Sequence, residues 1–510
     1  MRLPSLLLAC LALGASLLAA DLRLAAPLSD HMVLQREKAI AVWGWADAGE
    51  AITVTFAGQT KAATAEADGR WALKLDALPA SAEPRSLVVT GKGNRRIEVQ
   101  DVLVGEVWLG SGQSNMAMNV QSSNNFAAEK AAANFPLIRH YQESSATAEQ
   151  PQAEGKGQWR ACTPDRVGGF SAVLYFFGRE IHREVGVPVG LINTSIGGTP
   201  IESWVSAETQ LSDPDTKKNY EARMKAYQGF NPDKAKEAYE KHLADWKVAA
   251  DKAKAEGKEL PRKPTDPVAD RKYKGGPAGL YNGKVANLAP YTLRGMLWYQ
   301  GEGNAGNPGL YAKQLTQLVT SWRTLWQEEV PFAWVQLPNY RVSNSESWPR
   351  LRESMTKVLA LPKTGMAITL DIGDTRDIHP KNKQDVGKRL SYWALAMVYG
   401  QPVPAISGPL PAAHRIDGDA VRITFSHAAG LKTRDGAAPR GFLIAGADKI
   451  WKPATAVIEG EAVVVRSAAV PVPVAVRYAW AENPDCNVVN GAGLPASTFR
   501  TDTWPDVSAK

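Results

Sequence analysis

Apolar segments that end in small or polar residues restrict the fold of this 510-residue chain most strongly. One of them, 102–109, leads through a glycine-rich stretch to Ser114. Another, 366–370, leads toward His379. Buried parallel strands are typically continuous apolar runs, and ligands bind at their carboxyl ends in open α/β sheets. The pattern therefore predicts a parallel sheet with polar side chains gathered at one edge.

Further segments complete an α/β pattern. Apolar runs at 186–192, 293–300 and 332–337 are typical of buried strands. Apolar side chains at helical spacing lie between them and after the last strand, as at 311–325 and 386–397. About five parallel strands with intervening helices indicate a three-layer α/β/α domain.

Regions of different composition flank and interrupt this domain. Residues 21–100 alternate apolar and polar side chains, which predicts a β-sandwich-like domain, and 401–510 also reads as β-rich. Residues 206–274 are rich in Lys, Glu, Asp and Ala, which predicts a helical hairpin that is either packed on the sheet domain or a lid over its site. The α/β domain is then expected in two parts, 101–205 and 275–400.

Residues 1–20 have the pattern of a secretory signal peptide. Arg2 supplies a positive charge, 6–18 is apolar, and Ala19 and Ala20 offer small residues for cleavage. No other segment is long and apolar enough to span a bilayer. We therefore expect an exported protein, periplasmic or secreted, without a membrane span.

Charge and cysteine content argue against several other classes. The formal net charge is +7, but the lysines concentrate in 217–274 among many acids, which indicates a solvated helical surface rather than a nucleic-acid interface. Cys162 and Cys486 remain after the signal peptide, either bridged or as two separate buried thiols. No Cys or His spacing is typical of a metal site, and no cofactor is predicted.

A serine, a histidine and an acid follow strands of the predicted sheet. A serine hydroxyl becomes nucleophilic when a base held by a third group accepts its proton. Ser114 is the candidate nucleophile, and His379 is the candidate base because it follows a strand of the α/β domain. Asp377 is favoured as the third group, since residues two apart in an extended chain point to the same side, and Asp374 is an alternative. The set predicts a hydrolase.

Loops at three strand ends offer donors for a developing oxyanion. They are the backbone N–H of Ser114, the glycine pair that includes Gly198, and the segment 300–304 with its side-chain amides. The elbow of α/β-hydrolases does not fit, because Met116 stands where that motif has glycine.

Four short motifs together resemble the sialate O-acetylesterase branch of the SGNH hydrolases. They are 112–116 (GQSNM), 197–202 (GGTPIE), 298–302 (WYQGE) and 377–380 (DIHP). The likeness covers nearly the whole chain after the signal peptide, and 206–274 is its least typical part. The resemblance implies a three-layer α/β/α fold and hydrolysis of O-acetyl esters on sugars without a metal.

The resemblance also implies roles for the site residues. Ser114 would be the nucleophile and His379 the base that later acts as acid. The oxyanion donors would be the N–H groups of Ser114 and Gly198 and the side chain of Gln300, with Asn304 as a rival to Gln300.

The third member of the relay departs from the family pattern. The family commonly has an Asp three residues before the histidine, and that position is Arg376 here. Asp377, Asp374 or a backbone carbonyl is left to orient the ring of His379.

The substrate would be an acetylated carbohydrate. Trp204, Trp298 and Glu302 are the candidate substrate-binding residues, with Tyr299 as a further stacking ring. The sugar is expected to belong to acetylated xylan or other plant polysaccharide oligomers, or to be an O-acetyl sialic acid whose carboxylate favours an arginine. Three arginines are available for that carboxylate: Arg294, Arg352 and Arg376. The alternative is a non-catalytic carbohydrate-binding protein on a hydrolase scaffold.

Overall fold

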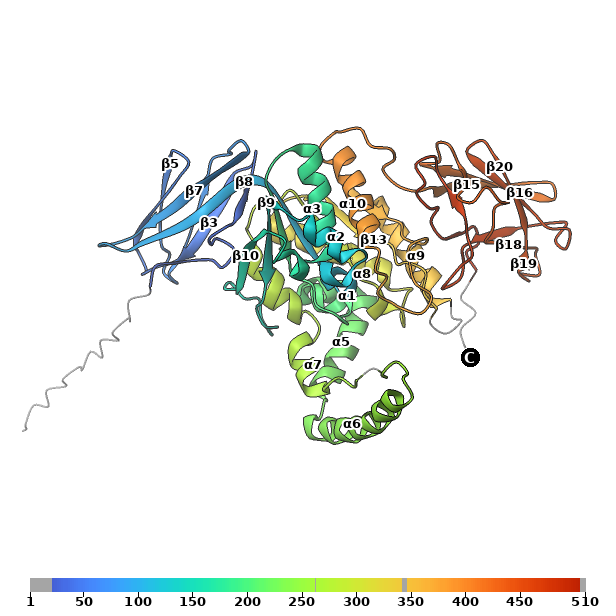
Figure 1. Ribbon diagram of the computed structural model, residues 1–510, viewed down its shortest axis with the longest axis horizontal. Coiled ribbons are helices and arrows are strands. Elements are labelled where there is room, and N and C mark those ends of the chain that lie inside the picture. Colours follow the sequence, from blue (N-terminus) through green and yellow to red (C-terminus); the bar gives the residue numbers. More distant parts are fainter. Residues whose placement is uncertain (1–20, 262, 342–345, 505–510) are drawn as a thin grey trace, which may run out of the picture.

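The computed structural model describes residues 21–261, 263–341 and 346–504 (Figure 1). The predicted signal peptide at 1–20 lies outside these residues. Within the described ranges, no helix combines the length and the apolar character needed to cross a membrane.

The α/β domain is built on six parallel strands and one antiparallel edge strand, which confirms the predicted parallel sheet. Their order across the sheet is β10, β9, β11, β8, β12, β13, β14. Strands β9 and β10 were not predicted from the apolar pattern. The bounds are β8 Arg96–Gly112, β9 Phe135–Glu143, β10 Gly157–Cys162, β11 Val189–Asn193, β12 Gly295–Tyr299, β13 Phe332–Val335 and β14 Thr364–Ala367.

Helices cover both faces of this sheet. Trp108 of β8 packs edge-on against Phe177 of α3 and Trp393 of α10. Trp298 of β12 points to the opposite face, where it meets Trp322 of α8. The three layers are therefore present as predicted. The bounds are α3 Ala172–Val185, α8 Tyr311–Trp326, α9 Ser347–Lys357 and α10 Lys383–Met397.

Strand β8 joins the N-terminal β region to the α/β sheet. Its first half pairs with β7 and β2, and its second half pairs with β11 and β12. One strand thus runs through the boundary expected at residue 100. The other strands of the region are β1 Arg23–Leu24, β2 Val33–Gln35, β3 Ile40–Trp45, β4 Ala51–Phe56, β5 Gln59–Thr64, β6 Arg70–Leu75 and β7 Ser81–Thr90.

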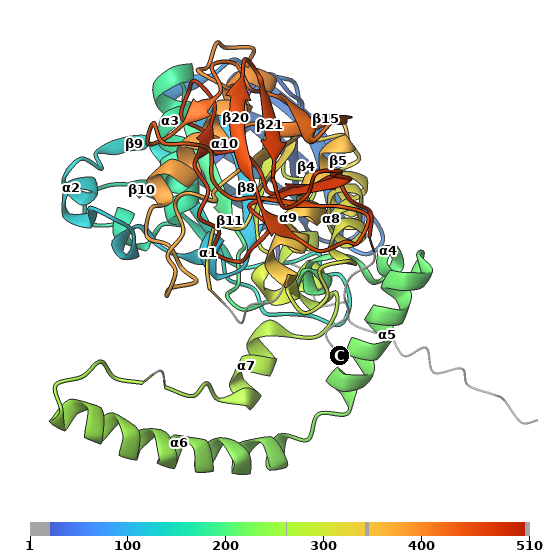
Figure 2. The same cartoon turned by 90° about the vertical axis from the view of Figure 1, so that its right-hand side faces the viewer.

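The insertion consists of helices α4 Ala207–Leu211, α5 Pro214–Gln228, α6 Pro232–Ala255 and α7 Pro267–Lys274. Asp213, Asn231 and Asp266 each cap a helix with the side chain and precede a proline at its first position. Both residue types are favoured there, because the side chain accepts an N–H that has no helical partner and proline has no N–H to satisfy. Figures 1 and 2 show α5 and α7 extending from the body and α6 lying beyond them.

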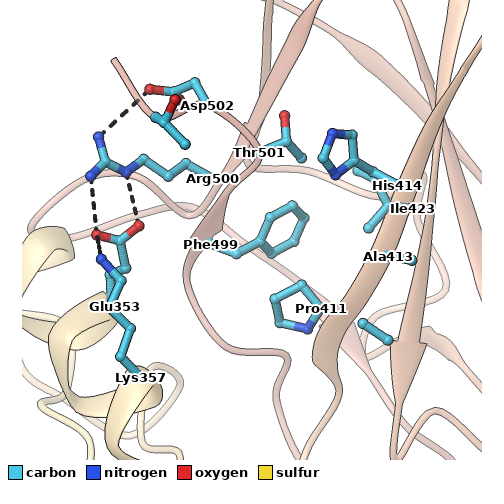
Figure 3. Close-up of a pocket in the computed structure, with 12 residues that line it drawn as sticks. Glu353, Lys357, Pro411, Ala413, His414, Ile423, Phe499, Arg500, Thr501 and Asp502 are labelled. Atoms are coloured by element: carbon cyan, nitrogen blue, oxygen red, sulfur yellow. Dashed lines mark hydrogen bonds and ion pairs between the residues drawn. The ribbon is translucent and has the colours of Figure 1, made fainter. Parts of the chain in front are cut away.

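The C-terminal region is β-rich, as predicted, and contacts the α/β domain. Figure 3 shows Arg500 of β24 reaching Glu353 of α9 beside a cavity of about 460 Å³. Cys162 and Cys486 are both free thiols rather than a bridge. The strands are β15 Leu410–Asp417, β16 Ala420–Ser426, β17 Lys432–Thr433, β18 Phe442–Ala445, β19 Lys452–Pro453, β20 Thr455–Glu459, β21 Ala462–Arg466, β22 Ala475–Tyr478, β23 Val488–Val489 and β24 Phe499–Arg500.

Candidate active site

A tight turn after β8 presents the Ser114 hydroxyl. Gly112 has φ 140°, and a Cβ atom there would lie 2.1 Å from the carbonyl oxygen of Tyr299 on β12. Only glycine fits this close approach. The short helix α1 (Ser114–Ala117) starts at once, and Ser114 remains partly exposed at the carboxyl edge of the sheet.

His379 meets this serine from the loop between β14 and α10. Its Nε2 lies 2.7 Å from Ser114 Oγ, although the two residues are 265 positions apart. The structure therefore brings together the predicted nucleophile and the predicted base in hydrogen-bond contact, which is the geometry that proton transfer between them needs.

Asp377 is the carboxylate next to the histidine ring. Its Oδ1 lies 3.6 Å from Nδ1 of His379 and accepts the backbone N–H of His379 at 2.9 Å. Asp374, the alternative, accepts the N–H groups of Arg376 at 2.8 Å and Asp377 at 3.2 Å, and the first of these bonds lowers the pKa of Asp374. Asp374 thus orders the turn, whereas Asp377 faces the ring.

The loop after β11 borders Ser114. Its Ile196 donates its N–H to the carbonyl of Gly112 at 3.0 Å. A Cβ atom on Gly197 would lie 3.4 Å from that of Ser114, and Gly198 has φ 68°, a conformation that favours glycine. The predicted donor Gly198 therefore belongs to the loop beside Ser114.

Gln300 does not show the contacts expected of an oxyanion donor. Its Nε2 donates to the carbonyl of Thr199 at 3.2 Å and to Oδ1 of Asn304 at 2.8 Å, so both amide hydrogens have protein acceptors. Its Oε1 accepts from Tyr311 at 2.8 Å, and its rival Asn304 donates to Glu202 at 2.9 Å. These amides join the ends of β11 and β12 through a buried network.

The predicted stacking residues lie in the core, which corrects the sequence interpretation. Trp204, Trp298 and Tyr299 are 0% exposed. Trp298 packs edge-on between Trp204 and Trp322, so no face of its ring is open to a sugar. Composition and motif position do not distinguish a core tryptophan from a sugar-binding one. The packing of α8 on the sheet makes the distinction, because it buries Trp298 against Trp322.

Glu302, a predicted substrate-binding residue, instead belongs to a charged cluster behind Ser114. It accepts from Nδ2 of Asn115 at 2.6 Å, and the Oδ1 of Asn115 accepts from Nζ of Lys383 at 2.5 Å. Burial raises the pKa of Glu302 and lowers that of Lys383 to about 7. Asn115 and Lys383 were missed from the sequence, although one follows Ser114 and the other lies four residues after His379.

Helix α7 of the insertion also reaches the site. A Cβ atom on Gly198 would lie 2.9 Å from Nζ of Lys274, the last residue of α7. Asp270 pairs with this ammonium at 2.8 Å. A cation of the insertion thus lies against the glycine loop that borders Ser114.

A serine and a histidine in contact at the carboxyl edge of a three-layer α/β/α sheet have the geometry of a serine hydrolase. The model of the family described as "Carbohydrate esterase, sialic acid-specific acetylesterase" matches residues 104–250 and 274–395. The chain belongs to this family.

Named relatives agree with this assignment. The chain is 32% identical over 437 residues to the sialate O-acetylesterase of Rattus norvegicus, covering 76% of each protein. It is 30% identical over 429 residues to that of Homo sapiens, covering 76% of this chain and 73% of the relative. The crystal structure of a carbohydrate acetylesterase from Xanthomonas citri is 37% identical with a TM-score of 0.79, covering 95% of this chain and 100% of the other. The protein is a carbohydrate esterase that acts on acetylated sugars.

Proposed function

We propose that the enzyme removes O-acetyl groups from sugars through an acetyl-enzyme intermediate on Ser114. The observation that carries the proposal is the 2.7 Å contact between Ser114 Oγ and His379 Nε2. In the first step, Oγ forms a bond to the acetyl carbonyl carbon while Nε2 takes the hydroxyl proton. The C–O bond to the sugar then breaks, and the protonated imidazole gives its proton to the leaving sugar oxygen.

The second half repeats the chemistry with water. Water attacks the acetyl-serine and gives a proton to Nε2, after which acetate leaves and Oγ recovers its proton. We assign Asp377 to orient the imidazolium. We assign the N–H groups of Ser114 and Gly198 to the oxyanion, and leave out Gln300 because its two amide hydrogens are already donated.

As substrates we propose acetylated neutral sugars, such as oligomers of acetylated xylan or another plant polysaccharide. Two of the three arginines considered for a substrate carboxylate have other partners: Arg294 pairs with Glu106 and Arg352 donates to backbone carbonyls. The signal-peptide pattern supports export to the periplasm or the medium, where such polymers occur.

O-acetyl sialic acid is the second candidate. The Lys274 ammonium beside Gly198 favours it, because a cation there would attract the sugar carboxylate. We rank it second because Asp270 already pairs with this lysine.

Acetate release by wild type and Ser114→Ala tests the mechanism. The panel contains acetylated xylan oligomers, O-acetyl sialic acids and an aryl acetate. We expect Ser114→Ala to lose at least about 10³-fold in kcat on each of them, because no other group forms the acetyl ester. We also expect the xylan oligomers to have a higher kcat/KM than the sialic acid esters.

Each result has a separate consequence. Acetate release by Ser114→Ala at the wild-type rate would remove Ser114 as the nucleophile and point to another catalytic site. No release by the wild type would instead support the binding-protein alternative. A higher kcat/KM for the sialic acid esters would be compatible with the proposed mechanism, but O-acetyl sialic acid would then replace acetylated neutral sugars as the proposed substrate.

A further inference from the structure

A buried cation and an enclosed carboxyl group flank the residue after the nucleophile. Lys383 and Asn115 are 0% exposed. Glu302 is partly exposed as a residue, but its Oε2 atom is enclosed by protein. The mechanism above uses none of these three side chains, and burying charged groups next to a reacting centre is costly unless they are matched.

The contacts hold the Asn115 amide in one orientation. Its Oδ1 accepts from Lys383, and its Nδ2 donates both to Glu302 Oε1 at 2.6 Å and to the carbonyl of Ile378 at 2.9 Å. A flipped amide would turn its NH₂ group toward the ammonium and its oxygen toward two acceptors. Every bond would then be lost, so the two charged residues determine how the amide sits.

This amide connects the two halves of the relay. Asn115 follows Ser114 on the β8–α1 turn, and Ile378 precedes His379 on the loop after β14. A single side chain therefore ties the backbone of the nucleophile turn to the backbone of the base loop.

We propose that Lys383 and Glu302 are a charge-balanced pair of positioning residues that hold the Asn115 amide in place and so keep His379 against Ser114. The proposal rests on the proposed function, since it assumes that these two residues carry the reaction. It assigns no contact with substrate to either member of the pair.

The charges that face Lys383 come from several elements. Glu302 follows β12, Asp377 lies on the loop after β14, and the ring of Tyr299 lies 5.2 Å from Nζ. The two carboxylates oppose the effect of burial, which lowers the pKa of Lys383 to about 7. His379 lies in the electrostatic field of the same charged groups. Removal of the charge of Lys383 or Glu302 should therefore change the pH at which the ring of His379 loses a proton.

The test is the pH profile of kcat/KM on an aryl acetate in Lys383→Met, Glu302→Gln and the double variant. Loss of the ammonium leaves carboxylates that stabilise a proton on His379, so we expect the acid limb to move up by at least about half a pH unit. Loss of the Glu302 charge should move it down, and the double variant should lie between the two.

Positioning also predicts a split between kcat and KM. Loosening of the amide should lower the maximal kcat of Lys383→Met on the order of 10- to 100-fold, with KM changing less than about 2-fold. Lys383→Arg, which keeps the charge, should recover most of the loss. Lys381→Met is the matched control, because Lys381 is an exposed lysine two residues before Lys383, on the loop that carries His379, and its charge is screened by solvent.

The proposal would be overturned if the acid limb of the pH profile stayed in place in all variants. It would also be overturned if the limb moved in the same direction in both single variants. If Lys383→Met does not fold, the downward shift in Glu302→Gln alone decides. Activity remaining in Ser114→Ala would instead remove the proposed function. If Ser114→Ala is inactive but the acid limbs of the Lys383 and Glu302 variants do not move, only the positioning role of this pair is removed.

Discussion

At the scale of single residues, His140 shows how burial sets a charge state. It lies in β9, is 2% exposed, and stacks on Phe170 with ring centroids 4.6 Å apart. Its Nε2 accepts the backbone N–H of Ser171, the residue that caps α3. Burial lowers the pKa of His140 to about 3, so the folded protein holds the ring neutral.

We expect this histidine to make stability depend on pH. The unfolded chain binds a proton at His140 below about pH 6.5, whereas the folded state resists it, so stability falls as the pH drops from about 6.5 toward 3. By pH 5 this group should cost about 2 kcal/mol relative to pH 7.5. Urea unfolding of wild type and His140→Gln at both pH values isolates the effect. Parallel losses in the two proteins would contradict it.

At the scale of elements, Glu202 attaches the insertion to the α/β body. It is 3% exposed and lies in the short 3-10 helix Ile201–Trp204 after β11. It accepts from Asn219 of α5 at 2.7 Å and from Gln314 of α8 at 2.8 Å, and it pairs with Arg223 of α5 at 3.0 Å. These bonds favour a packed insertion, one of the two alternatives the sequence left open, over a lid.

We expect Glu202→Gln to loosen α5 without unfolding the body. Both carboxylate oxygens of Glu202 accept hydrogen bonds, so the NH₂ group of the glutamine would face donors in either orientation. The loss of charge-assisted bonds should lower the free energy of unfolding by about 2–3 kcal/mol. Limited proteolysis should then cut within 207–261 at least about 10-fold faster, with mass spectrometry locating the cuts. Glu208→Gln, at an exposed position on α4, is the matched control. Equal rates in both variants would mean that Glu202 does not anchor the insertion.

At the scale of the whole molecule, Arg352 joins the α/β domain to the C-terminal region. Its buried guanidinium on α9 donates to the carbonyls of Leu337 and Pro338, which follow β13, and to those of Ala481 and Glu482, which follow β22. Each distance is 2.8 or 2.9 Å. Burial lowers the pKa of Arg352 to about 9.

We expect Arg352→Met to uncouple the two regions. Four buried carbonyls would lose their donor, which should cost more than about 3 kcal/mol. Calorimetry should show a separate, earlier transition for the C-terminal region, whereas Arg415→Met, at an exposed position on β15, should melt like wild type. A single transition at the wild-type temperature would contradict this role.

Much of the fold followed from local pattern. Continuous apolar runs marked β8, β11, β12, β13 and β14, because strands buried on both faces leave no polar positions. The edge strand β10 carries alternating exposed residues and was not recognised. The expected domain boundary at residue 100 divides strand β8. The amino-acid composition of β8 changes near the point where its pairing passes from the N-terminal strands to those of the α/β sheet.

The order of four motifs by itself indicated the family. It also placed Ser114 and His379 at one edge of the sheet, because the carboxyl ends of parallel strands lie along the same edge. Only the tertiary structure decided that Trp204 and Trp298 are core, and that Gln300 donates to its neighbours. It also decided that Lys383 lies against Asn115, behind Ser114. Burial and hydrogen-bond partners depend on residues far apart in the chain, and no local pattern carries that information.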